Sequence, residues 1–76
     1  SGEAGGFLED RRFVKDFEEL FKFYKDARLE LLTKTESRLL AVFRTGQTER
    51  DVKVLRFSVD TSGRVTYVDN RGEADV

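Results

Sequence analysis

Acidic residues that stand side by side are the first candidates for chemistry in this sequence, because two carboxylates can share the work of general acid and base. Two such pairs occur, Glu9–Asp10 and Glu18–Glu19. Neighbouring side chains on a helix point about 100° apart, so the members of each pair do not share a site. We therefore interpret both pairs as solvated surface groups, and we predict no catalytic residue.

The sequence lacks the residue types that most other catalytic sites require. It contains no Cys and no His, which excludes thiol nucleophiles, Ser-His triads and the usual zinc sites. No G-x-x-x-x-G-K-[ST] phosphate-binding loop is present. Residues 60–64 and 69–73 are rich in side-chain oxygen, but Asp, Asn and Gly are ordinary turn formers. The sequence thus predicts no metal, no cofactor and no enzymatic activity for this chain by itself.

A pattern of arginines interleaved with aromatic residues is compatible with nucleic-acid binding, since sheet faces of this kind stack bases and hold phosphates. The candidate contacts are Arg38, Arg44, Arg56 and Arg64. Against this hypothesis, 14 basic residues are balanced by 15 acidic ones, and the net charge of −1 provides no long-range attraction for a polyanion. Nucleic-acid binding is therefore kept as the alternative function.

The length of 76 residues allows one small domain. Such a domain has an expected stability of roughly 3–5 kcal/mol, and without Cys or His it gains nothing from a disulfide or a zinc ion. A stabilising partner is therefore expected. Residues 1–6, which are small and Gly-rich, are predicted to be a flexible leader or tag remnant, and residues 7–76 a single domain taken from a larger protein, since no Met is present.

No apolar run approaches the roughly 18 residues that a membrane helix needs, so no membrane association is expected. No signal-peptide pattern appears either. The absence of Cys fits a reducing compartment. We expect a cytoplasmic protein.

Apolar residues recur at steps of three and four near the N-terminus, which is typical of one face of a helix. They are Phe13, Phe17, Leu20, Tyr24 and Ala27. The pattern predicts a helix near residues 8–26. From Ala27 onward the apolar residues alternate, which favours a strand over residues 27–33; an alternative is a helix that continues to Lys34.

Three further segments alternate as strands do, near residues 38–45, 52–59 and 64–69. The sequence Asp60-Thr61-Ser62-Gly63 between the last two is typical of a hairpin turn. The predicted fold class is α+β: an N-terminal amphipathic helix packed on a three- to four-stranded antiparallel meander.

The predicted strands have a second apolar face, which a single helix cannot cover. This predicted patch consists of Leu40, Val42, Val52 and Val54, with Tyr67 as a further candidate. Such a patch needs a cover, either the rest of a parent protein or a second copy in a weak homodimer. Phe23 lies off the apolar stripe of the helix and is a further candidate for contact with a partner. The leading functional hypothesis is a non-catalytic interaction or scaffold module.

Several stretches resemble one known family. They are FLEDRRFV (residues 7–14), DFEEL (16–20), YKDARL (24–29), RLLAVF (38–43) with TG (45–46), and VTYVDNRGE (65–73). Together they resemble an internal segment of very large bacterial multidomain proteins of the DNA repair ATPase type. The resemblance implies a non-catalytic module whose parent protein binds nucleotide elsewhere, and it places no ATPase residue on this chain.

Overall fold

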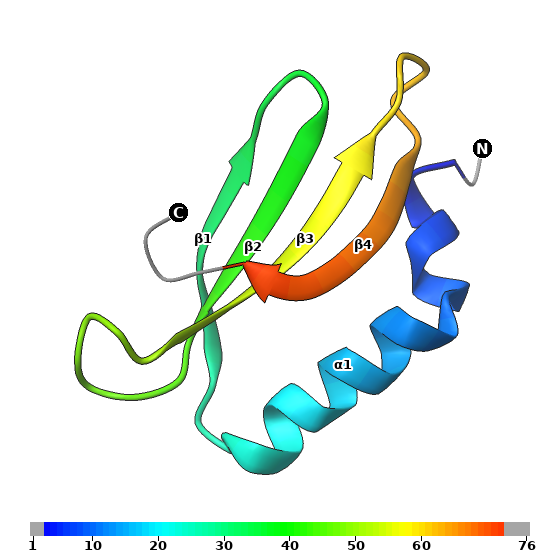
Figure 1. Cartoon of the computed structure of the whole chain (residues 1–76). Coiled ribbons are helices and arrows are strands. Elements are labelled where there is room, and N and C mark those ends of the chain that lie inside the picture. The colour runs from blue at the N-terminus through cyan, green and yellow to red at the C-terminus, as the bar shows by residue number, and fades with distance from the viewer. Residues whose placement is uncertain (1–2, 73–76) are drawn as a thin grey trace.

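The computed structural model describes residues 3–72, which form two helical elements followed by one sheet. The 3-10 helix η1 spans Glu3–Glu9 and the α-helix α1 spans Arg11–Phe23. The sheet has four antiparallel strands in the order β1-β2-β3-β4 (Figure 1). Their bounds are β1 Arg28–Lys34, β2 Arg38–Arg44, β3 Val52–Val59 and β4 Val65–Gly72. The predicted α+β meander is confirmed.

Helix α1 begins and ends at capped positions. The side chain of Asp10 accepts a hydrogen bond of 2.8 Å from the backbone N–H of Arg12, which satisfies one of the free donors at the helix start. At the other end, the N–H of Tyr24 donates to the carbonyl of Leu20 over 3.0 Å. Because β1 begins at Arg28, the interpretation in which the helix stops before the first strand is confirmed, and the alternative of a helix to Lys34 is wrong.

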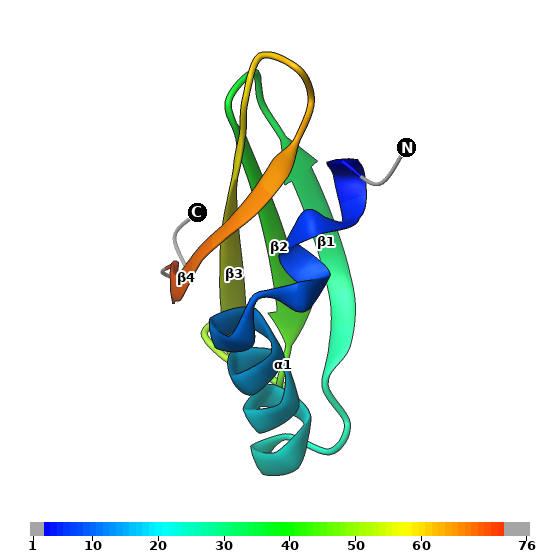
Figure 2. The same ribbon diagram turned by 90° about the vertical axis from the view of Figure 1, so that its right-hand side faces the viewer.

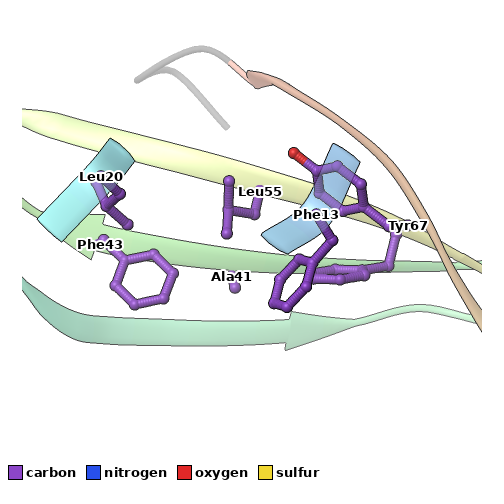
Figure 3. Packing of buried hydrophobic residues seen from close by; sticks show 7 residues of the cluster. Phe13, Leu20, Ala41, Phe43, Leu55 and Tyr67 are labelled. Carbon is purple, nitrogen blue, oxygen red and sulfur yellow. The ribbon is translucent and has the colours of Figure 1, made fainter. Parts of the chain in front are cut away.

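The main core lies between α1 and one face of the sheet (Figure 3). Its buried members are apolar residues from α1 and from β2, β3 and β4, namely Phe13, Leu20, Ala41, Phe43, Leu55, Phe57 and Tyr67. Tyr67 pairs with Phe57 across β3 and β4, which places it on the side that the helix covers. The expectation that Tyr67 lies on the opposite face is therefore wrong.

The hairpin between β3 and β4 has the predicted turn. Gly63 adopts a φ of 90°, which a residue without Cβ reaches without strain. The Asp60 carboxylate accepts hydrogen bonds of 2.9 Å from the N–H groups of Ser62 and Arg64. Strand β4 then continues to Gly72, beyond the predicted end at residue 69, with register shifts against β3 along the way.

The N-terminal segment differs from its prediction. Residues 1–6 were expected to be a flexible leader, but the structure places Glu3–Glu9 in η1; residues 1–2, and 73–76 at the other end, lie outside the described residues. The reason is the aromatic residue that follows the glycines. The ring of Phe7 lies 5.2 Å from that of Phe13 and 4.9 Å from that of Phe57, measured between centroids. This contact holds η1 against the core.

Phe13 should be the most sensitive position of this core. Its ring lies within 5.2–5.8 Å of the rings of Phe7, Phe17, Phe57 and Tyr67. Loss of a buried Phe costs about 3–5 kcal/mol, which equals the whole stability of roughly 3–5 kcal/mol expected for a domain of this size. We expect Phe13→Ala to be largely unfolded at 25 °C. Urea unfolding followed by circular dichroism measures this, with Phe23→Ala, at a residue 69 % exposed, as the control that changes little. A wild-type midpoint for Phe13→Ala would contradict the assignment.

Candidate interaction surfaces

The predicted patch on the second face of the sheet is already covered within the chain. Leu40, Val42 and Val54 are only 5 %, 8 % and 0 % exposed, and Val52, which packs against them, is half-buried. The expectation of an open apolar face is therefore wrong. These residues form a second small core, so they are not available as a docking surface in this structure.

Two ion pairs flank this second core on the same face of the sheet. Arg56, which is opposite Leu40, donates two hydrogen bonds of 2.6 Å to the carboxylate of Asp69. Arg44, which is opposite Val52, donates to Glu30 over 2.9 and 2.7 Å. Arginine side chains bury their aliphatic stems on apolar surface while the charged head remains wet. The sequence analysis named these apolar residues, and it named Arg44 and Arg56 as candidate nucleic-acid contacts, but it did not predict their ion pairs.

The same pairs bear on the hypothesis of nucleic-acid binding. Of the four candidate arginines, Arg44 and Arg56 are held in bidentate contact with carboxylates. Arg38 and Arg64 are exposed; Arg38 lines a shallow pocket together with Arg56, and Arg64 lies at the end of the β3–β4 turn. Two of the four candidate arginines are thus already engaged by carboxylates.

The ion pairs shift the pKa values of both partners. The hydrogen bonds from Arg56 are the main cause that lowers the pKa of Asp69 to about 2, and Arg44 likewise lowers the pKa of Glu30. On α1, the Asp16 carboxylate accepts a hydrogen bond of 2.6 Å from the hydroxyl of Tyr67. Burial, followed by this bond, raises the pKa of Tyr67. These contacts join neighbouring elements of the fold.

The largest exposed apolar residues of the sheet lie on β1. Leu29, Leu31 and Leu32 are 54 %, 54 % and 57 % exposed, although Leu31 pairs with buried Val42 and Leu32 with buried Ala41. In Figure 2, η1 and α1 lie in front of the sheet, and Figure 1 shows that β1 forms the edge farthest from them, whereas β4 is the strand that both helices contact. Strand β1 thus presents apolar side chains toward both faces, next to both cores. This surface, which we call the β1 edge, was missed in the sequence, although the first strand of a meander is always an edge strand.

The opposite edge of the sheet is chemically different. At β4, the guanidinium of Arg12 donates hydrogen bonds to the backbone carbonyls of Tyr67 (3.0 Å) and Val68 (3.3 Å). Asp10 holds that guanidinium through an ion pair of 3.0 Å. Register shifts along β3 and β4 further disturb this edge. Irregular pairing and charged side chains are the features by which proteins prevent strand addition, so β4 is a protected edge.

Phe23, the other predicted contact residue, lies beside a shallow pocket between the end of α1 and the sheet. The pocket has a volume of about 200 Å³ and is lined by Asp16, Glu19, Leu20, Phe23, Tyr24, Lys53, Leu55 and Asn70. The ammonium group of Lys53 lies 5.7 Å from the centre of the Tyr24 ring. Phe23 itself is 69 % exposed, which agrees with its predicted position off the buried stripe.

Within residues 3–72, no cluster of three or more acidic, Cys or His side chains is placed to hold a metal ion. No helix in that part of the chain is long and apolar enough to cross a membrane.

The fold and its surfaces describe a small α+β module with one protected and one open sheet edge. A family model with the description "ATPase involved in DNA repair" matches residues 1–76, the whole chain, and the chain therefore belongs to that family. The resemblance noted in the sequence is confirmed. Comparison with curated proteins gave no match, and comparison with solved structures gave none.

The Arg56–Asp69 pair predicts a dependence of stability on pH. The pKa of Asp69 is about 2 in the folded chain, below the value of about 3.9 for an unfolded Asp. The stabilisation is therefore fully present above about pH 4 and is lost as the pH falls toward 2. In Asp69→Asn we expect the unfolding temperature to fall less steeply between pH 4 and pH 2 than in the wild type. The difference should be modest, because both side chains are partly exposed. Thermal unfolding between pH 2 and 7 measures it, with Asp26→Asn, in the link between α1 and β1, as control. The same decrease of unfolding temperature below pH 4 in Asp69→Asn and in the wild type would contradict a role for this ion pair.

Proposed function

We propose that this chain is a non-catalytic interaction or scaffold module of a larger bacterial ATPase that acts in DNA repair. In this role the module binds other protein segments, and nucleotide binding and turnover belong to other parts of the parent protein. Membership of a family described as an ATPase involved in DNA repair supports the context. The β1 edge supports the mode of action.

The observation on which the proposal depends is the contrast between the two edges of the sheet. A strand at an edge has backbone groups that can pair with another strand, and the added strand gains affinity from hydrogen bonds and specificity from side-chain contacts. At β4, Arg12 already occupies such carbonyls. At β1, three leucines more than half exposed lie beside this row of backbone groups. The open edge is the one suited to a partner.

The burial of the second core changes which surface the proposal names. Because Val54 is completely buried, a partner does not need to cover the Leu40–Val42–Val54 cluster. Leu29, Leu31 and Leu32 are instead the residues whose burial by another strand would bring a hydrophobic gain of about 25 cal/mol per Å².

Binding of a segment of the parent protein should protect the β1 edge. The N–H of Thr35 donates to Arg38 of β2, so in the antiparallel ladder the N–H groups of Leu32 and Lys34 point away from β2. We expect the amide hydrogen exchange of these two residues to slow when the remaining parts of the parent protein are added as a separate chain. Leu31→Glu should weaken this binding by at least tenfold, since it places a charge among the leucines. Leu8→Glu is the matched control, because Leu8 on η1 is 59 % exposed but lies outside β1.

Two results would count against the proposal. One is protection confined to the Phe23 pocket, with β1 unchanged. The other is a salt-dependent shift of labelled DNA that is lost in Arg38→Ala, which would favour the nucleic-acid alternative.

A further inference from the structure

We infer that the chain binds one amphipathic helix with acidic flanks, which packs beside α1 over β1 and completes the helix layer on that face of the sheet. The inference rests on the proposed role of the chain as a module that binds other segments of its parent protein, and it names a second surface and the chemistry of the segment that occupies it. It follows from the apolar side chains that α1 and β1 leave exposed, from the width of the sheet and from the charges around these side chains.

Strand β1 exposes two leucines on the side of the sheet that carries α1. Leu29 pairs with Phe43 and Leu32 with Ala41, and both of these β2 residues belong to the core beneath the helix. Because residues opposite one another in an antiparallel pair lie on the same face, both leucines lie on the helix side. They are nevertheless 54 % and 57 % exposed, so this part of the face is left open by α1.

Helix α1 directs apolar side chains toward the same region. On one flank of the helix, Arg12 bonds to β4. On the other flank, the rings of Phe17 and Phe21 lie 6.2 and 5.8 Å from that of Phe43 on β2, measured between centroids. Val14 stands two helical turns before Phe21 and shares its flank. Val14 and Phe17 remain 38 % and 37 % exposed. The exposed apolar side chains of α1 and β1 thus form one region, the α1–β1 surface, which consists of Val14, Phe17, Phe21, Leu29 and Leu32.

The dimensions of the sheet fit one further helix on this surface. Strands lie about 4.8 Å apart, so four of them span roughly 14 Å between the outer two, whereas a helix is about 10 Å wide. One helix therefore covers about two strands, and α1 is held toward β4 by Arg12 and Asp16, with β1 as the far edge (Figure 1). Packed helices lie about 8–10 Å apart, which is about two strand spacings, so a second helix beside α1 lies over β1. A strand added at the edge extends the sheet but does not cover Val14.

The charges around the α1–β1 surface select the chemistry of that helix. Beyond its apolar side chains, the same flank of α1 continues with Arg11, Glu18 and Lys22, all of them exposed. Lys34, which pairs with Leu39, lies on the helix side at the end of β1. Three of these four charges are positive, and within residues 3–72 the ion pairs are formed by other side chains. Carboxylates on the flanks of the bound helix complement them.

The same charges disfavour a second copy of the chain as the occupant. A two-fold contact uses the same surface on both partners. It would therefore bring Arg11, Lys22 and Lys34 of both copies into one interface, and like charges that face one another oppose association. A helix of the parent protein with acidic flanks meets no such repulsion.

The test places opposite charges at Val14. The remaining parts of the parent protein, as a separate chain, are titrated into the wild type, Val14→Glu and Val14→Lys, and calorimetry measures the affinity. Val14→Glu should weaken binding at least tenfold, because it sets a carboxylate against acidic flanks. Val14→Lys removes the same apolar contact but should weaken binding at least threefold less than Val14→Glu. Glu and Lys are better helix formers than Val, so both variants should fold, which circular dichroism confirms.

The same substitution on the opposite flank of α1 is the matched control. Phe23 is 69 % exposed, and Phe23→Glu should bind as the wild type does. Wild-type affinity in Val14→Glu overturns the inference, and a larger loss in Val14→Lys than in Val14→Glu overturns the acidic character of the helix. A wild-type dimer that is lost in Val14→Glu overturns the helix as occupant in favour of a second copy.

Amide exchange separates this inference from the proposed function. If the parent segments protect the amides of Leu32 and Lys34 while Val14→Glu binds as the wild type does, strand addition at the β1 edge stands and only the helix fails. If the parent segments do not bind the wild-type chain at all, both fail.

Discussion

The contact between Phe13 of α1 and the aromatic side chains of the sheet is the interaction on which the rest of this structure depends. With 76 residues and no Cys, the chain has one helix to cover one sheet, and neither element buries its apolar face without the other. Phe13 meets Phe57 on β3 and Tyr67 on β4, and Phe7 meets Phe13 from η1. These contacts join segments from both ends of the chain. The hydrogen bond from Tyr67 to Asp16 then fixes how α1 lies over β4.

This placement of α1 has consequences for the two edges of the sheet. The first turn of the helix lies beside β4, so Arg12 reaches the carbonyls of that strand. Neither helix of the described part of the chain (residues 3–72) gives such cover to the β1 side of the sheet, and the leucines there remain exposed. The protected edge and the open edge are therefore two results of one packing arrangement. A helix displaced toward β1 would lie over Leu29 and Leu32, which share its face of the sheet, and would leave β4 without its arginine.

Periodicity was sufficient to predict α1 and the four strands, but it predicted neither η1 nor which surfaces are exposed. The steps of Phe13, Phe17 and Leu20 identified the helix, and alternation identified the strands, because both patterns are local. Exposure depends on neighbours that are distant in the sequence. Leu40, Val42 and Val54 were predicted to form an uncovered face because alternation within a strand does not show that these side chains are buried in the folded chain. The N-terminal glycines were predicted to form a leader because local patterning does not show the contact of Phe7 with Phe57, which are far apart in the sequence.

The candidate site was predictable only in part, for the same physical reason. Phe23 was identified correctly as an exposed aromatic residue because its helical phase alone separates it from the buried stripe. The leucines of β1 were assigned to the correct strand, yet their exposure follows from strand order, which places β1 at an edge, and from the position of α1. An apolar pattern indicates that a residue favours burial. Whether other elements of the folded chain pack over that residue depends on the whole fold. Where the chain supplies it, as at Val54, a core results, and where it does not, as at Leu32, the residue is left for a partner.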